Sequence, residues 1–146
     1  MRRLFIIRKD LQLEPGKLAA MVGHCAEGYW TMLISKYAVN NNDGTYTVSF
    51  ALDSGIIDKY INDIFTKTIC EAKNLNQLMK AEEIAKELGL IENVDYGFID
   101  DCCKTDLTPE FKDENGVGRC RVGIWFKPLD DEIAHTISKK FKLYRS

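Results

Sequence analysis

Four polar side chains have the types and spacing for acid–base or electrostatic chemistry: Lys17, His24, Asp101 and Thr105. Lys17 and His24 are seven residues apart, so on a helix they lie on nearly the same face, two turns apart. A lysine in the first turn opposes the helix dipole, a cost that a phosphate or another anionic partner would offset. Taken singly, Lys17 also fits an ordinary exposed lysine, and His24 fits a half-buried polar residue of an amphipathic helix.

Asp100, Asp101 and Thr105 follow an apolar segment of strand length, residues 96–99. A carboxylate beside a hydroxyl at a strand end can orient a water molecule for attack on a substrate. It can also pair with Lys17 if the sheet brings the two together. Sheets of α/β proteins commonly place their sites at such strand ends.

Other catalytic and ligand-binding motifs are missing from the sequence. No serine-histidine-acid arrangement is suggested, and Gly16-Lys17 lacks both the first glycine and the following Ser or Thr of a Walker loop. A zinc site would need closely spaced thiol or imidazole pairs, and with His24 and His135 as the only histidines that interpretation is weak. The residues alone therefore indicate an α/β domain with a possible Lys, His and Asp site.

The elements that must position these residues alternate between strands and helices. We expect core strands over residues 4–7, 68–72, 96–99 and 121–126, a short strand over 45–52, and helices over 17–34, 56–65, 75–88 and from 130 onward. The alternation predicts a layered α/β fold with a small sheet, in a single domain over residues 1–146. We interpret residues 100–118 as a long polar loop, with a functional part at 100–105 and a surface insertion at 111–118.

Charged residues are unevenly distributed, although the net charge is only −2. Residues 1–36 have a balance of +3 and residues 119–146 a balance of +4, whereas residues 37–118 have a balance of −9. If the two ends of the chain lie together, they could form one positive face on an acidic body. The plainer interpretation is a solvated surface without a dedicated role.

The sequence favours a cytoplasmic location. No apolar run approaches the roughly 18 residues of a membrane span, and residues 8–10 interrupt the apolar start before a signal-peptide core is complete. The five cysteines are an odd number without a C-x-x-C pair, which fits reduced thiols.

Two segments near the start resemble the signature of the type 2 peptidyl-tRNA hydrolases of archaea and eukaryotes. Residues 5–13 read FIIRKDLQL and residues 16–26 read GKLAAMVGHCA; the family signature is an apolar strand, R-x-D-L, then G-K-x-A-A-Q-x-x-H. Further matches follow in order: a strand at 68–71, AKELGL at 85–90 for A-x-x-L-G-L, DCCKT at 101–105 for D-A-G-x-T, and Pro128 with FKLY at 141–144. Residues 38–53 and 111–118 have no counterpart and look like insertions.

The resemblance implies a fold, an activity and a set of site residues. The fold would be a three-layer α/β/α arrangement around a four-stranded mixed sheet, with an inserted strand or hairpin near residues 38–53. The activity would be hydrolysis of the ester between peptide and tRNA in peptidyl-tRNA, which recycles tRNA for translation, with no metal or organic cofactor. The family's lysine falls on Lys17, its histidine on His24, its acid on Asp101 and its threonine on Thr105.

These positions suggest roles. Asp101 would orient or activate water, Lys17 would bind phosphate or stabilise negative charge developing on the ester, and Thr105 would supply a hydrogen bond. We expect six basic residues to bind tRNA: Arg8, Lys9, Lys17, Arg119, Arg121 and Lys142. A local positive face on an acidic body would be enough for that binding.

The chain departs from the family signature at several site positions. The family's glutamine is Met21, and its Ala-Gly after the acid is Cys102-Cys103, which puts a side chain where glycine permits unusual backbone angles. Its P-G-[ST]-x-T segment aligns with residues 118–122, so both hydroxyls are lost, at Cys120 and Val122.

Two accounts of the departures stay open. One is a divergent enzyme that keeps Lys17, Asp101 and Thr105, and the other is a family member that binds RNA or protein without turnover. The sequence also leaves open whether the chain forms a homodimer, since a new edge strand in the insertion could pair with another chain or cover the core.

Overall fold

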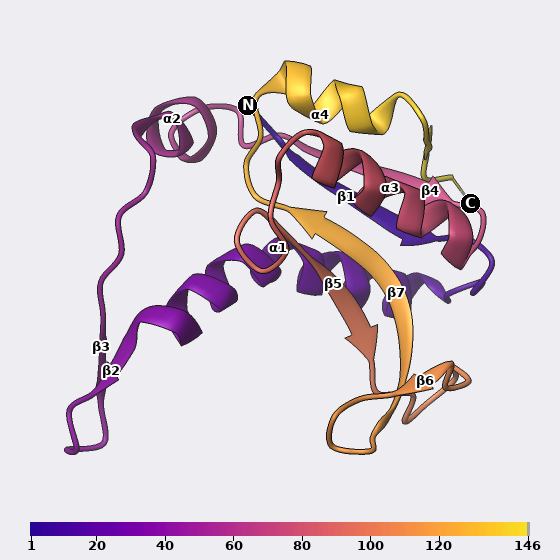
Figure 1. The fold of residues 1–146 in the computed structure, drawn as a ribbon, viewed down its shortest axis with the longest axis horizontal. Helices are drawn as coiled ribbons and strands as arrows, with labels where there is room; N and C mark the ends of the chain where they lie inside the picture. Colours follow the sequence, from indigo (N-terminus) through magenta and orange to yellow (C-terminus); the bar gives the residue numbers. More distant parts are fainter. Residues whose placement is uncertain (146) are drawn as a thin grey trace.

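The sheet is organised around β1 (Arg3–Arg8), which is buried along its whole length. In the computed structural model, which describes residues 1–145, β1 pairs in parallel with β4 (Lys67–Ala72) and antiparallel with β7 (Gly118–Phe126). The strand order is β5-β7-β1-β4-β8, with β5 (Tyr96–Asp101) and β8 (Lys142–Leu143) at the two edges (Figure 1). β1 reads as an uninterrupted apolar run because both of its faces are covered.

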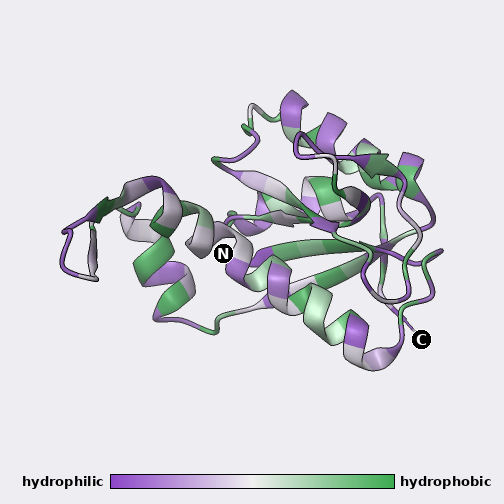
Figure 2. Ribbon diagram, turned by 90° about the horizontal axis from the view of Figure 1, so that it is seen from below, coloured by the Kyte–Doolittle hydropathy of each residue, from purple (hydrophilic) through white to green (hydrophobic). Residues whose placement is uncertain are grey.

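Three helices cover the two faces of the sheet: α1 (Pro15–Tyr37), α3 (Leu75–Glu87) and α4 (Asp131–Ser138). Side chains of β1 alternate between the faces, so Phe5 and Ile7 pack in the cluster with α1, whereas Leu4 and Ile6 pack in the cluster with α3 and α4. Figure 2 shows apolar residues along the strands and on the helices beside them. The expected three-layer α/β fold is confirmed.

The sheet has six strands, so the expectation of four was too low. The two additional strands are β8 and β6 (Phe111–Lys112), and β6 pairs with the start of β7. A tight turn joins them, in which Asp113 Oδ1 accepts hydrogen bonds from the amides of Asn115 and Val117. Residues 100–118 are therefore not one long loop, because β5 runs on through Asp101 and a hairpin occupies the second half.

The insertion near residues 38–53 forms a hairpin, as expected, but the hairpin stands apart from the main sheet. β2 (Ala38–Asn40) and β3 (Tyr46–Val48) pair antiparallel as a separate two-stranded sheet. Together with the end of α1 they project from the body as an arm (Figures 1 and 2). The expected strand over 45–52 is thus shorter, and the arm does not cover the core, since Val39 and Tyr46 are exposed.

The segment between the arm and β4 begins earlier and ends earlier than the helix expected over 56–65. It consists of α2 (Ser54–Ile56) and the π-helical turn η1 (Ile57–Ile61). Asp53 caps the start by accepting a hydrogen bond from the amide of Gly55. Phe65, with φ of 66°, lies beyond the end of the turn. No helix in residues 1–145 has the length and hydropathy needed to cross a membrane.

Candidate functional site

The candidate site joins the first turn of α1 to the last residue of β5. Lys17 Nζ lies 3.0 Å from Asp101 Oδ1. Both side chains are half-buried, with 22% and 11% of their surface exposed, so the pair is partly shielded but open to solvent. The structure thus brings together two residues that the sequence could only suggest as partners.

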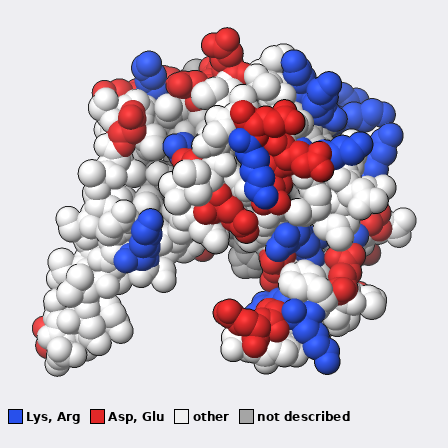
Figure 3. Space-filling model, in the orientation of Figure 1, with Lys and Arg blue, Asp and Glu red and all other residues white. Residues whose placement is uncertain are grey.

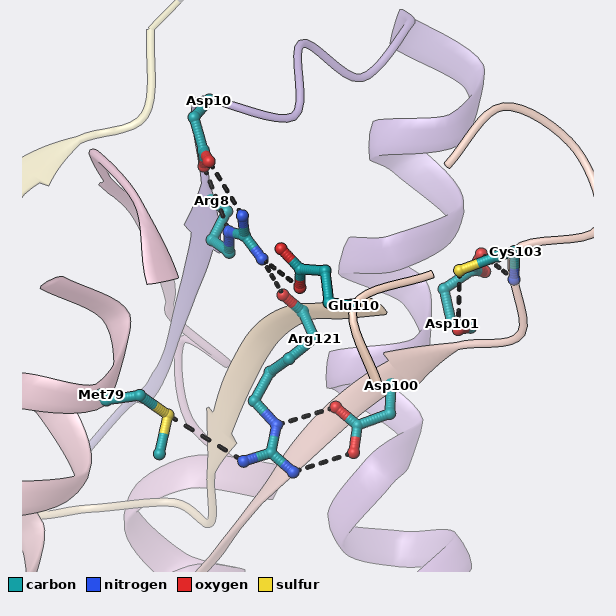
Figure 4. A network of polar contacts seen from close by, with 8 residues as sticks. All are labelled: Arg8, Asp10, Met79, Asp100, Asp101, Cys103, Glu110 and Arg121. Carbon is teal, nitrogen blue, oxygen red and sulfur yellow. Dashed lines mark hydrogen bonds and ion pairs between the residues drawn. The ribbon is translucent and has the colours of Figure 1, made fainter. Parts of the chain in front are cut away.

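The second carboxylate oxygen of Asp101 is held by the backbone. The amide of Cys103 donates to Asp101 Oδ2 at 2.9 Å (Figure 4). Cys103 has φ of 58°, a left-handed conformation that a residue with a side chain adopts at a cost of roughly 1 kcal/mol or more. The position that carries glycine in the family signature therefore keeps a glycine-like backbone, and this backbone fixes the carboxylate.

The environment of Asp101 favours its ionised form. Burial raises the pKa of Asp101, but hydrogen bonds from Lys17 and the Cys103 amide, together with the charges of Lys17 and His24, hold it below the ordinary value of 3.8. Asp101 is therefore a carboxylate at neutral pH. A carboxylate of low pKa is a good hydrogen-bond acceptor but a weak base, which suits orienting a water molecule.

His24 and Thr105 occupy different positions relative to this pair. His24 lies two turns along α1 from Lys17 and lines a cavity of about 580 Å³ between α1 and β5. Thr105 is exposed in the segment after β5, and within residues 1–145 no hydrogen bond joins it to Lys17 or Asp101. The structure therefore brings three of the four expected catalytic residues to one side of α1.

Arg8 is enclosed by acceptors rather than presented to a ligand. Its side chain is 5% exposed and donates to both oxygens of Asp10, to Glu110 at 2.7 Å and to the carbonyl of Arg121 (Figure 4). Burial lowers the pKa of Arg8, but the two carboxylates more than compensate and raise it. Arg8 is a structural cation.

Arg119 and Arg121 are also paired with carboxylates. Arg121 binds both oxygens of Asp100, at 2.8 and 3.0 Å (Figure 4). Its guanidinium also lies 3.9 Å from the ring centre of Phe98. Arg119 Nε lies 2.9 Å from Asp113. With Arg8 and Lys17, four of the six basic residues expected to bind tRNA are thus neutralised within the protein.

The other two, Lys9 and Lys142, lie at an open positive surface. Lys9 donates to the carbonyl of Arg145, and its ammonium lies 4.5 Å from the centre of the Tyr144 ring. We call the following group the C-terminal cationic surface: Lys9, Lys139, Lys140, Lys142 and Arg145. No ion pair within residues 1–145 neutralises them. Figure 3 shows Lys and Arg side chains gathered over the ends of α4 and β8, at the upper right.

The hydroxyls of the family signature have apolar replacements here. Cys120 and Val122 are both buried in β7. Burial, together with the neighbouring Glu110, raises the pKa of the Cys120 thiol to about 12, so the thiol stays protonated. All five cysteines are free thiols, and within residues 1–145 no group of three or more His, Cys, Asp or Glu side chains is arranged to hold a metal ion.

The fold and the site define an α/β domain with an open lysine–aspartate pair between a helix start and a strand end, beside a cationic surface. The family model described as "Peptidyl-tRNA hydrolase PTH2" matches residues 1–144, and the chain belongs to this family. A search of curated proteins found no match. The resemblance to type 2 peptidyl-tRNA hydrolases is therefore confirmed over nearly the whole chain.

Proposed function

We propose that this protein hydrolyses the ester that joins the peptide to tRNA in peptidyl-tRNA. Membership of the family supports the substrate and the reaction. The observation that carries the proposal is the 3.0 Å pair of Lys17 and Asp101, on two elements that the fold must bring together. It combines an acceptor for water with a cation for developing negative charge, the two requirements of ester hydrolysis.

In the proposed reaction, Asp101 accepts a hydrogen bond from the attacking water. The water oxygen bonds to the ester carbonyl carbon, and Lys17 stabilises the negative charge that develops on the carbonyl oxygen. The bond from carbon to the ribose oxygen then breaks, the ribose hydroxyl regains a proton, and the peptide leaves as its carboxylic acid. We assign the assistance of proton movement to His24, which lies on the same face of α1 and lines the cavity.

The C-terminal cationic surface is the proposed contact for the tRNA backbone. Lys9 follows β1 and lies on the stretch of chain that leads into α1, so the surface continues toward Lys17. Lysine and arginine side chains release counterions from nucleic acid phosphates, which makes such binding sensitive to salt. A positive surface on an acidic body thereby supports tRNA binding despite a net charge of −2.

A second candidate function is tRNA binding without turnover. It is favoured by the loss of the family's hydroxyls at Cys120 and Val122 and by the burial of Met21 in place of the family's glutamine. The two functions differ in a direct assay, in which tRNA carrying an N-acetylated amino acid is incubated with wild-type protein and with Asp101→Ala. If the wild type releases the amino acid from tRNA and Asp101→Ala does not, the result supports the hydrolase. If both proteins bind the tRNA tightly and release occurs only at the background rate, the result supports tRNA binding without turnover.

A further inference from the structure

The cavity beside the catalytic pair is a groove along the free edge of β5. Phe98, Ile99 and Asp100 line it together with one face of α1. β5 is the edge strand of the sheet, and its register with β7 shifts between Ile99 and Asp100, so these three consecutive residues line the space beside that edge. Figure 3 shows the molecule hollowed between the arm and the part that carries β5 and β6.

The backbone at this edge has unused hydrogen-bonding groups at Phe98, whereas the carbonyl of Tyr96 accepts from the Asn93 amide and that of Asp100 from Arg119. The amide of Lys127 donates to the carbonyl of Asp95 across β5 and β7. In an antiparallel pair, every second residue of a strand bonds to the partner strand, and the residues between them direct their N–H and C=O groups away from it. In this register Phe98 is one of the residues whose N–H and C=O groups point away from β7. Within residues 1–145 no hydrogen bond occupies these two groups. β5 is the last strand on this side of the sheet, so the edge can accept another strand.

The groove runs along α1 toward the arm from His24 and Asp100, and Asp100 is the chain neighbour of Asp101. Lys17 of α1 meets Asp101 of β5, and farther along α1 Gly28 and Gly97 both abut the indole of Trp125, where an added Cβ would lie 2.5 Å from it. α1 and β5 are therefore antiparallel. From His24 to Ser35 the groove is roughly 16 Å long by helix rise, room for about five residues of extended chain.

The lining chemistry favours a peptide over a nucleic acid backbone. Trp125 and Ile99 are apolar, Thr31 and Ser35 carry hydroxyls, and Glu27 adds a carboxylate, whereas no lysine or arginine lines the groove. A polyphosphate would meet negative charge here without a compensating cation. An extended peptide would bond to the β5 backbone without regard to its side chains, as in strand addition.

We propose that the groove between α1 and β5 binds the peptide part of peptidyl-tRNA as an additional strand on β5. The inference rests on the proposed function, because that function places the ester at Lys17 and Asp101. With the peptide's C-terminal residue at Asp101, a preceding residue pairs with Phe98, so the peptide runs parallel to β5. The pairing stops before Tyr96, whose outer edge is already bridged by Glu92. Backbone pairing at this edge lets the site accept peptides of any sequence.

The test uses analogues that cannot be hydrolysed. N-acetyl-alanine or N-acetyl-pentaalanine is joined through an amide to 3′-amino-3′-deoxyadenosine, and dissociation constants are measured by calorimetry. We expect the wild type to bind the longer analogue about tenfold more tightly and to protect the Phe98 amide from hydrogen exchange. Thr31→Phe, which fills the groove, should remove the difference in affinity between the two analogues. Ile34→Phe, on the same helix but outside the groove lining, should keep that difference.

Three results would overturn the proposal. The first is equal affinity of the wild type for both analogues, and the second is a Thr31→Phe variant of unchanged melting temperature that still prefers the longer one. The third is that Thr31→Phe equally weakens binding of the trinucleotide CCA without a peptide, since the groove would then take RNA. The hydrolase proposal is judged separately. If the longer analogue binds more tightly but peptidyl-tRNA is not hydrolysed, only the hydrolase proposal is contradicted. If peptidyl-tRNA is hydrolysed but both analogues bind equally, only the peptide-groove proposal is contradicted.

Discussion

Lys17 Nζ and Asp101 Oδ1 lie 3.0 Å apart although 84 positions separate the two residues in the sequence. The contact depends on the sheet, because β7 pairs with β1 on one side and with β5 on the other. β1 leads into α1, which carries Lys17, and β5 ends at Asp101, so the arrangement of the sheet places the two charged side chains next to each other. This ion pair is the feature on which the proposed chemistry depends.

The proposed hydrolytic activity should be retained at acidic pH, and Lys17 should determine the pH at which it is lost. Because the pKa of Asp101 lies below 3.8, we expect kcat/KM to fall only near or below about pH 4. Lys17→Met removes a hydrogen bond and a charge that lower this pKa and leaves the burial that raises it, so the acid limb of the profile should move to higher pH. Rates measured between pH 3 and 7 for both proteins check this. An unshifted limb would show that another group titrates.

Glu110 should make the stability of the protein depend on pH in a defined direction. The pKa of Glu110 is lowered chiefly by the hydrogen bond from Arg8, against an opposing effect of burial. A lowered pKa in the folded state contributes stability that is complete above the unfolded value of about 4.5 and is lost as the pH falls through the folded value. Urea unfolding at several pH values should show this loss, and Glu110→Gln should make the acid slope shallower.

Arg8 should matter for stability rather than for tRNA affinity. We expect Arg8→Met to lower the free energy of unfolding by about 2–3 kcal/mol, less than for a fully buried pair because its carboxylate partners reach solvent. Lys142→Met is the matched control: it should leave unfolding within about 0.5 kcal/mol of the wild type and weaken tRNA binding. If Arg8→Met instead weakened tRNA binding and left the free energy of unfolding unchanged, Arg8 would belong to the tRNA-binding surface.

The C-terminal cationic surface should be visible in the salt dependence of binding. Each lysine that contacts a phosphate contributes about 0.7–0.9 to the slope of log K against log salt. Replacing Lys139, Lys140 and Lys142 by methionine should therefore lower the slope for tRNA by about two to three. Lys36→Met, on the arm, should leave it unchanged. An unaltered slope in the triple variant would place the phosphate contacts elsewhere.

Cys103→Gly should stabilise the site without changing its geometry. Glycine relieves the left-handed conformation at φ of 58°, and the gain should be at most about 1 kcal/mol because glycine also makes the unfolded chain more flexible. The amide that holds Asp101 Oδ2 is retained, so the rate of hydrolysis should be kept. A destabilised or inactive variant would mean that the Cys103 side chain itself is needed.

Much of the fold could be predicted because strong local patterns specify it. The apolar run of β1 is read directly from neighbouring residues. Asparagine is a residue type that favours a helix start, and Asn74 caps α3 by accepting a hydrogen bond from the amide of Gln77. β6 and β8 were missed because strands of two residues show no periodicity. They form only because a neighbouring strand is there to pair with.

The residues of the candidate site could be proposed from the sequence, but their contacts could not. Lys17, His24 and Asp101 follow from helix spacing, strand ends and the family motifs. The burial of Arg8 depends on Glu110, which lies 102 positions away, and no local signal links the two. The groove could not be foreseen either, since a free strand edge is a property of strand order and not of residue type.

The central claim is that Asp101 acts with Lys17 in hydrolysing peptidyl-tRNA, and single-turnover kinetics test it most directly. Excess protein is mixed with tRNA that carries an N-acetylated, labelled amino acid, and release of the label is followed at pH 7. We predict release by the wild type and a rate at least about a hundredfold lower for Asp101→Asn, with Asp58→Asn, an exposed control, equal to the wild type. Equal rates for the wild type and Asp101→Asn would contradict the account.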